Sequence, residues 1–163
     1  MAIDLPSRRP DGTLAADAQA VRDSSTCAAL PQEGESVGAV LARDPEPGDL
    51  GSAIVPADDG TATLTREGAK ASVYNDATDE QAAPALDALG THALVTLGEP
   101  VTGLGWQQHP STCVVTLQGR SFSPALQREF ATHTTSVVEI DAGHGPMLTK
   151  PAELAAAIAV AAG

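Results

Sequence analysis

The hydrophobic pattern changes character along this chain, and the most regular part begins after residue 112. Cys113 to Leu117 is a continuous, largely β-branched run, which is typical of a buried parallel strand, and Ser136 to Ile140 predicts a second strand. Between them, Ser123-Pro124 predicts the start of a helix that ends near Thr132. An Ala-rich helix is expected from Pro151 to Ala162. This order predicts a β-α-β-α unit in which the two strands are parallel and the crossover is right-handed.

The part of the chain before residue 90 predicts short helices and one hairpin. Ala53–Pro56 and Thr61–Leu64 flank Asp59-Gly60, a turn signal between two apolar segments. Thr78-Asp79-Glu80-Gln81 has the pattern of a helix capping box. Residues 90–112 are expected to be irregular because they are rich in Gly and Pro. The other expected elements are a strand end at Ala2–Leu5 and helices at Thr13–Arg22, Val37–Ala42, Arg66–Tyr74 and Asp79–Leu89.

Composition limits the function classes. The 163 residues suffice for one domain with its own core, and because aromatics make up only 2%, that core is built from Ala, Val, Leu and Ile. A net charge of -12 argues against nucleic acid and anionic membranes as partners. No apolar run approaches the length of a membrane span, and the N-terminus lacks the apolar region of a signal peptide. We therefore expect a cytoplasmic protein.

The cysteines and most of the histidines form no recognisable site in the sequence. Cys27 and Cys113 both lie among apolar residues, so buried thiols are expected, with a disulfide or a reactive thiol as the alternative. His92, His109 and His133 are scattered, and no His, Cys, Asp or Glu spacing matches a metal site. No G-x-G-x-x-G phosphate loop follows a strand. We expect neither a metal nor a cofactor.

The sharpest motif is Asp141-Ala142-Gly143-His144-Gly145-Pro146-Met147-Leu148-Thr149, which comes directly after a predicted parallel strand. Open α/β sheets place their sites at that end of the strands, and the flanking glycines allow a sharp turn that presents the imidazole. A strand followed by G-H-x-P-x-L and a helix resembles the catalytic-histidine loop of α/β-hydrolases. The resemblance is closest to the group of small esterases, methyl esterases and hydroxynitrile lyases.

Further segments extend this resemblance over most of the chain, most strongly over residues 99–160. Pro31 to Val37 resembles the entry to the cap of that family, and residues 53–75 resemble the cap hairpin and helix. The segments at 2–22, 106–115 and 149–154 also match. The resemblance implies an α/β class and a partial α/β-hydrolase fold. Its parts would be a remnant parallel sheet with the β-α-β-α unit at about 111–163, and a small helical cap with a hairpin at about 31–110. Together they would form a single incomplete domain over residues 1–163.

The resemblance implies a Ser-His-Asp triad, in which Ser attacks a carbonyl, His takes its proton and Asp orients the imidazole. His144 matches the histidine, with a structural loop histidine as the alternative interpretation. Gly119 falls at the position of the acid, and a glycine cannot orient an imidazole. Asp141 is close to His144 in sequence, but it follows the wrong strand for the acid of the family.

The nucleophile of the family should follow a β-branched strand within a G-x-S-x-G turn that leads into a helix. Between Val21 and Cys27 there is no room for these elements, so the resemblance implies an internal deletion of the nucleophile segment, together with missing N-terminal strands. Residues 34–38 formally satisfy G-x-S-x-G, which makes Ser36 the alternative nucleophile. Pro31 and the polar residues before Ser36 argue against a buried strand there and favour a loop or helix-cap serine.

Three function hypotheses follow. The favoured one is an α/β-hydrolase-like protein that resembles small-ester hydrolases, retains His144 and is catalytically incompetent as this chain. The first alternative is a non-enzymatic binding or interaction module on the cap, and the second is an active serine esterase that uses Ser36 and His144. The expected ligand is a small ester or carbonyl compound. Because an incomplete sheet would expose Val114, Val137 and Ile140, we also expect self-association through the sheet edge.

Overall fold

The computed structural model describes residues 31–104 and 111–161, with side chains up to residue 159. The expected strand end at Ala2–Leu5, the expected helix at Thr13–Arg22 and Cys27 all lie outside the described residues. The described helices are α2 (Val37–Ala42), α3 (Leu50–Ala53), α4 (Arg66–Ser72), α5 (Asp79–Asp87), α6 (Val95–Gly98), α8 (Pro124–Ala131), α9 (Pro146–Thr149) and α10 (Pro151–Ala161). The described strands are β1 (Ile54–Pro56), β2 (Thr61–Leu64), β3 (His92–Ala93), β4 (Thr112–Thr116) and β5 (Ser136–Ile140).

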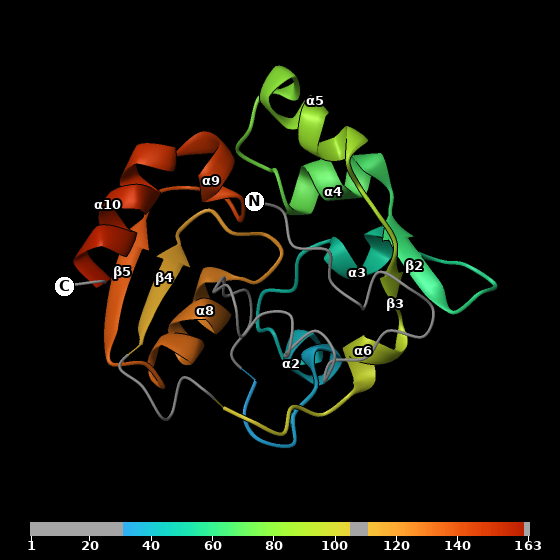
Figure 1. The fold of residues 1–163 in the computed structure, drawn as a ribbon, viewed down its shortest axis with the longest axis horizontal. Helices are drawn as coiled ribbons and strands as arrows, with labels where there is room; N and C mark the ends of the chain where they lie inside the picture. The colour runs from blue at the N-terminus through green and yellow to red at the C-terminus, as the bar shows by residue number, and fades with distance from the viewer. Residues whose placement is uncertain (1–30, 105–110, 162–163) are drawn as a thin grey trace.

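The C-terminal part of the chain forms the predicted β-α-β-α unit. Strands β4 and β5 are parallel and pair from Thr112 opposite Ser136 to Thr116 opposite Ile140. Figure 1 shows α8 against one side of these strands, while α9 and α10 lie beyond β5. A parallel pair needs a crossover connection, and α8 provides it between β4 and β5.

Helices pack against both faces of this small sheet. On one face, Cys113 and Val115 of β4 pack with Ala131 of α8, so the expected burial of Cys113 is confirmed. On the other face, Ile140 packs with Ala142 and with Ala157 of α10. Alternation of side chains along a strand explains why neighbouring residues contact different helices.

The expected exposure of this sheet is only partly correct. Val137 is 48% exposed, as predicted. It points to the same face as α8, but α8 packs on β4 and leaves Val137 of β5 uncovered. Ile140 is only 4% exposed, so the prediction that it would be uncovered is wrong. The reason is that α10 folds back on the sheet and supplies Ala157 and Leu154 as packing partners, which also leaves Val114 half-buried.

The cap-like part contains a three-stranded antiparallel sheet in the order β1-β2-β3. The predicted hairpin is confirmed, with Ile54 opposite Leu64 and Pro56 opposite Ala62. In its turn, the Asp59 carboxylate accepts hydrogen bonds from the Thr61 N–H at 3.0 Å and hydroxyl at 2.7 Å. Gly60 has a φ of 83°, a conformation that suits glycine.

Three short elements and one strand are absent from the sequence prediction. Residues 90–112 were expected to be irregular, but β3 pairs with β2 and α6 follows it, so that prediction is wrong for this stretch. Strand β3 has two residues and exists because the edge of β2 is there to pair with it, which no local pattern shows. Helices α3 and α9 have four residues each, which is about one turn and too short for an apolar stripe to be recognised in the sequence.

The predicted helix starts are confirmed at the level of individual hydrogen bonds. The Thr78 hydroxyl accepts from the Gln81 N–H, and the Gln81 side chain accepts from the Thr78 N–H, which is the predicted capping box. Ser123 caps α8 by accepting from the Leu126 N–H at 3.1 Å, with Pro124 in the first turn. Predicted ends are less accurate, since α4 and α5 stop two residues early.

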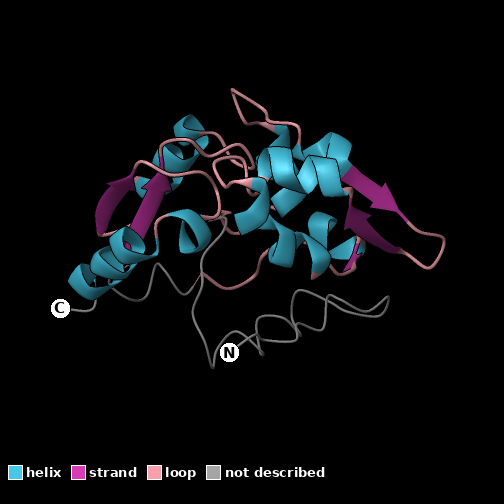
Figure 2. Ribbon diagram, turned by 90° about the horizontal axis from the view of Figure 1, so that it is seen from above, coloured by secondary structure: helices cyan, strands magenta, loops and turns pink. Residues whose placement is uncertain are grey.

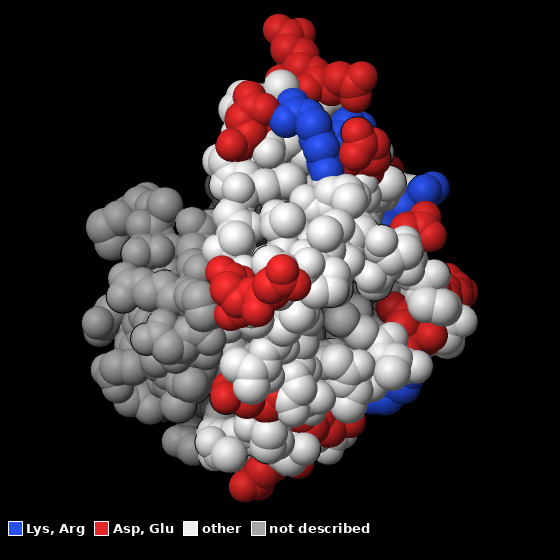
Figure 3. Space-filling model, turned by 90° about the vertical axis from the view of Figure 1, so that its right-hand side faces the viewer, with Lys and Arg blue, Asp and Glu red and all other residues white. Residues whose placement is uncertain are grey.

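Seen from above, the parallel sheet and the antiparallel sheet lie at opposite ends of the molecule, with helices between them (Figure 2). The face that carries the β1–β2 hairpin shows separate groups of Asp and Glu with fewer Lys and Arg and much uncharged surface (Figure 3). None of the helices in residues 31–104 and 111–161 combines the length and the apolarity that a membrane span requires.

Candidate functional site

The loops that follow β4 and β5 lie side by side. The parallel ladder continues past the strands, because the Leu117 N–H donates to the Ile140 carbonyl at 3.0 Å and the Gln118 N–H donates to the Ala142 carbonyl at 2.9 Å. The Gln118 side chain also donates to Asp141 at 3.0 Å. These bonds place the loop with Gly119 beside the loop with His144, at the end of the sheet where α/β proteins carry their sites.

His144 lies half-buried near the end of the short connection from β5 to α9, two residues before α9 begins. Its ring centroid is 5.7 Å from that of Phe122, with the two rings tilted by 49°. Burial lowers the pKa of His144, because an apolar surrounding disfavours the charged imidazolium. The neutral imidazole is the form that can accept a proton or a hydrogen bond.

Two residues from the connection between α4 and α5 hold the backbone of this loop. One oxygen of Asp76, Oδ2, accepts from the Gly143 N–H at 2.7 Å and from the Thr149 hydroxyl at 2.8 Å. Asn75 Oδ1 accepts from the His144 N–H at 3.4 Å. Asn75 Nδ2 donates to the Gln118 carbonyl at 2.8 Å, so the same side chain contacts the loop after β4 as well.

The close approach of Asn75 and Asp76 requires a glycine at position 143, and the space at Gly145 is tight. A Cβ at Gly143 would lie 2.3 Å from Asp76 Oδ1 and 2.6 Å from Asn75 Oδ1. A Cβ at Gly145 would lie 3.2 Å from the Val73 carbonyl oxygen. The sequence predicts that these glycines allow a sharp turn, but neither has a positive φ. The reason that the structure shows is the close contact with the α4–α5 connection.

The position expected to carry the acid is closely surrounded. A Cβ at Gly119 would lie 2.5 Å from Gln127 Nε2, 2.7 Å from Thr116 Oγ1 and 3.0 Å from the Phe122 carbonyl oxygen. Real Cβ atoms do not approach other atoms so closely, and a carboxylate would extend further. The surroundings of position 119 therefore fit only a residue without a side chain.

Gln127 of α8 fills the space inside the turn that Gly119 belongs to. Its Oε1 accepts from the Thr116 N–H at 2.8 Å and from the Thr116 hydroxyl at 3.1 Å. Its Nε2 donates to the Phe122 carbonyl at 2.9 Å and to the Thr116 carbonyl at 3.2 Å. A buried amide with all these bonds fixes the path of the loop, and the sequence pattern did not single it out.

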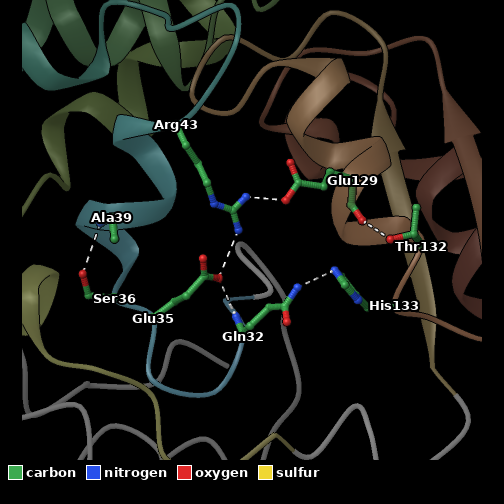
Figure 4. A network of polar contacts seen from close by, with 8 residues as sticks. All are labelled: Gln32, Glu35, Ser36, Ala39, Arg43, Glu129, Thr132 and His133. Carbon is green, nitrogen blue, oxygen red and sulfur yellow. Dashed lines mark hydrogen bonds and ion pairs between the residues drawn. The ribbon is translucent and has the colours of Figure 1, made fainter.

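Ser36, the alternative nucleophile, serves as the N-cap of α2. Its Oγ accepts from the Ala39 N–H at 3.1 Å. Figure 4 shows this bond beside a polar network in which Arg43 contacts Glu35 and Glu129, and Gln32 contacts His133 at 3.3 Å. The described contacts of the Ser36 side chain thus belong to the start of a helix, and none of them is to His144.

Sequence analysis missed most of the partners of His144. Asn75 and Asp76 come from a polar turn 69 and 67 residues away from the atoms they bind, and only the fold brings them there. Asp141 contacts Gln118 and none of the described bonds joins it to the imidazole. No group of three or more His, Cys, Asp or Glu that could hold a metal ion occurs among residues 31–104 and 111–161.

Comparisons with known proteins give no match to a family model and no significant match to a curated protein sequence. Solved structures do match. A pyrethroid hydrolase from Sphingobium faniae JZ-2 superimposes with a TM-score of 0.62 at 23% identity over 80% of this chain and 56% of that chain. A mutant of polyneuridine aldehyde esterase gives a TM-score of 0.61 at 13% identity, covering 80% of this chain and 58% of the other.

A second structure of polyneuridine aldehyde esterase covers 95% of this chain and 58% of that chain, with a TM-score of 0.56 at 12% identity. Both proteins have the α/β-hydrolase fold, so the predicted likeness to this fold is confirmed. This chain spans less than three fifths of the length of either structure. Its fold is therefore part of an α/β-hydrolase fold, with the mixture of a small parallel sheet and an antiparallel sheet described above.

Proposed function

We propose that this partial α/β-hydrolase fold retains the histidine loop of an esterase-like site and is, as this chain, unable to complete the hydrolytic reaction. The observation that carries the proposal is the surroundings of Gly119. Hydrolysis by this fold needs a carboxylate to orient the histidine, and the space beside Gly119 is taken by the hydrogen-bonded amide of Gln127. Loss of the orienting acid alone costs about four orders of magnitude in kcat.

The surroundings of Ser36, the candidate nucleophile, support the same conclusion. The only G-x-S-x-G in the 163 residues is at 34–38, and its serine caps a six-residue helix. A nucleophile elbow instead needs a strand before the serine, so that the turn lifts the hydroxyl toward the histidine. The four residues Pro31 to Gly34 contain no strand. Ser36 therefore has neither the support of a strand nor a described contact with His144.

The site keeps properties that suit binding without turnover. The imidazole of His144 is half-buried against Phe122 and has a lowered pKa, so at neutral pH it offers one hydrogen-bond acceptor and one donor. A small ester or carbonyl compound is the class of ligand that such a site would take. Saturable binding of such a compound without turnover would agree with the proposal.

A fluorophosphonate probe tests the proposal directly, because it labels only serines activated by a neighbouring base. We expect the intact mass of the native protein to stay unchanged after treatment, as it should for the heat-denatured protein. A matched variant is Ser36→Asn, since Asn caps a helix as well as Ser does and lacks the hydroxyl. His144→Gln serves as the second variant, because it removes the base.

Labelling of the native protein that disappears in both variants would contradict the proposal and identify Ser36 and His144 as an active pair. Labelling that persists in both would point to a different activated serine and contradict it as well. A circular dichroism spectrum of each sample is the control, because absence of labelling supports the proposal only when the chain is folded.

A further inference from the structure

The connection between α4 and α5 contacts the histidine loop through hydrogen bonds as well as through apolar packing. Leu148 of α9 packs on a cluster in the cap-like part that includes Ala69, Ala77 and Leu86, which already attaches α9 to that part. Asn75 and Asp76 then add three hydrogen bonds to the two loops that follow β4 and β5 and one to the end of α9. We propose that Asn75 and Asp76 are positioning residues that hold the His144 loop in place and thereby make the imidazole position depend on the cap-like part.

The contacts of Asp76 lie on both sides of His144, one to the backbone and one to a side chain. Its Oδ2 accepts from the Gly143 N–H, the residue before the histidine, and from the Thr149 hydroxyl at the end of α9. A single carboxylate oxygen thus binds the residue before His144 and the last residue of the helix that follows it. Hydrogen bonds to a charged acceptor are stronger than neutral ones, although Asp76 itself is exposed.

Asn75 joins the histidine loop to the loop after β4. Its amide oxygen faces the His144 N–H and its amide nitrogen donates to the Gln118 carbonyl. An amide side chain is suited to this role because it carries an acceptor and donors at the same end. Gly143 completes the arrangement, since any larger residue would collide with both Asn75 and Asp76.

The test is the titration of His144 by NMR, which needs no catalytic activity. Protein labelled with carbon-13 at histidine is titrated, and the signal of His144 is assigned by its loss in His144→Gln. We expect Asp76→Ala to loosen the loop, hydrate the imidazole and raise the pKa of His144 toward its ordinary value. We also expect exchange of the Gly143 amide hydrogen to become about tenfold faster, as loss of a hydrogen bond to a charged group implies.

The direction of the shift separates positioning from simple electrostatics. A nearby carboxylate favours the imidazolium, so removal of its charge alone would lower the pKa of His144 further. Asp76→Asn removes the charge but keeps an oxygen that can accept both hydrogen bonds. We therefore expect Asp76→Asn to speed up Gly143 exchange less than Asp76→Ala does, because its hydrogen bonds are kept but are weaker, and not to raise the pKa of His144.

Asp79→Ala is the control, because Asp79 lies three residues further along the chain with a fully exposed side chain. The proposal would be overturned if folded Asp76→Ala left the titration of His144 and the exchange of Gly143 unchanged. Equal changes in Asp79→Ala would overturn it as well. If Asp76→Ala does not fold, Thr149→Val and Asn75→Ala replace it. Thr149→Val removes one contact of Asp76, and Asn75→Ala removes both contacts of Asn75. The same direction of change is expected in each, and wild-type behaviour in both would overturn the proposal.

This inference rests on the proposed function only in treating His144 as the retained residue of the site. The two can fail separately. Labelling by the fluorophosphonate probe would contradict the loss of hydrolysis and leave the positioning role intact. An unaltered His144 signal in the variants would contradict the positioning role and leave the loss of hydrolysis unaffected.

Discussion

At the scale of residues, the atoms around Gly119 leave no space for a side chain in the loop after β4. A Cβ there would meet the Gln127 amide, the Thr116 hydroxyl and the Phe122 carbonyl at 3.0 Å or less. The Gln127 side chain could move only by giving up hydrogen bonds to buried backbone groups of Thr116 and Phe122. Such groups cost about 1–3 kcal/mol each when they lose their partner. The sequence predicts that the acid of the family is missing at this position, and the structure shows which groups surround Gly119.

We predict that Gly119→Asp lowers the free energy of unfolding and restores no ester hydrolysis. The expected loss is about 1–3 kcal/mol, the usual cost of forcing extra atoms into a packed site. Chemical denaturation followed by circular dichroism measures it. Gly103→Asp is the matched control, because nothing lies within 4 Å of a Cβ at that position. Equal stability of the two variants would show that the space at Gly119 is not limiting.

At the scale of elements, the start of α8 depends on a residue that is distant in the sequence. Asp44 follows α2 and is only 7% exposed. Its carboxylate accepts from the N–H of Ser123 at 2.8 Å and from the Ser123 hydroxyl, while that hydroxyl caps α8 through the Leu126 N–H. The cap of α8 was predictable from Ser123-Pro124. The support of this cap by Asp44 was not predictable, because Asp44 lies 79 residues away from Ser123.

We predict that Asp44→Ala destabilises the protein by roughly 1.5–3 kcal/mol, the range for hydrogen bonds to a charged group. Negative charge near a helix N-terminus adds to the effect, so Asp44→Asn should recover only part of the loss. Asp49→Ala is the comparison, since Asp49 precedes α3 without a side-chain cap bond. Urea denaturation of the three variants checks the order, and equal midpoints for Asp44→Ala and Asp49→Ala would contradict it.

At the scale of the whole molecule, the parallel sheet leaves a strand edge without a described neighbour. Among the described residues, β5 pairs only with β4. Val137 is exposed beside this edge, and Ile158 of α10 is 57% exposed. An uncovered strand edge is a template for pairing with another chain, and a two-fold arrangement would place Val137 opposite its own copy. The net charge of -12 opposes this contact through repulsion.

We predict that the protein self-associates through the edge of β5, more strongly at high salt because ions screen the acidic surface. Size-exclusion chromatography with light scattering should give twice the monomer mass at high concentration. Val137→Glu should shift the mass to that of the monomer. Val95→Glu is the matched control, since Val95 is 55% exposed on α6 and away from the sheet. A monomer under all conditions, or equal effects of both variants, would contradict the prediction.

The sequence by itself determined the elements that local patterns specify. These are the two β-branched strands, the capped helices at Thr78 and Ser123, the hairpin at Asp59-Gly60 and the histidine loop after β5. Each depends on side-chain periodicity, capping chemistry or a turn residue, and these act over a few residues. Together with the family likeness of the loop around His144, they were sufficient for the partial α/β-hydrolase fold.

Only the tertiary structure decided which segments lie against each other. Strand β3 forms because β2 offers an edge, and Ile140 is buried because α10 folds back over the sheet. The Asn75–Asp76 contacts and the place of Gln127 beside Gly119 join residues that no local pattern connects. The physical reason is that hydrogen bonds and packing between distant segments depend on the path of the whole chain, whereas propensity and capping depend on near neighbours.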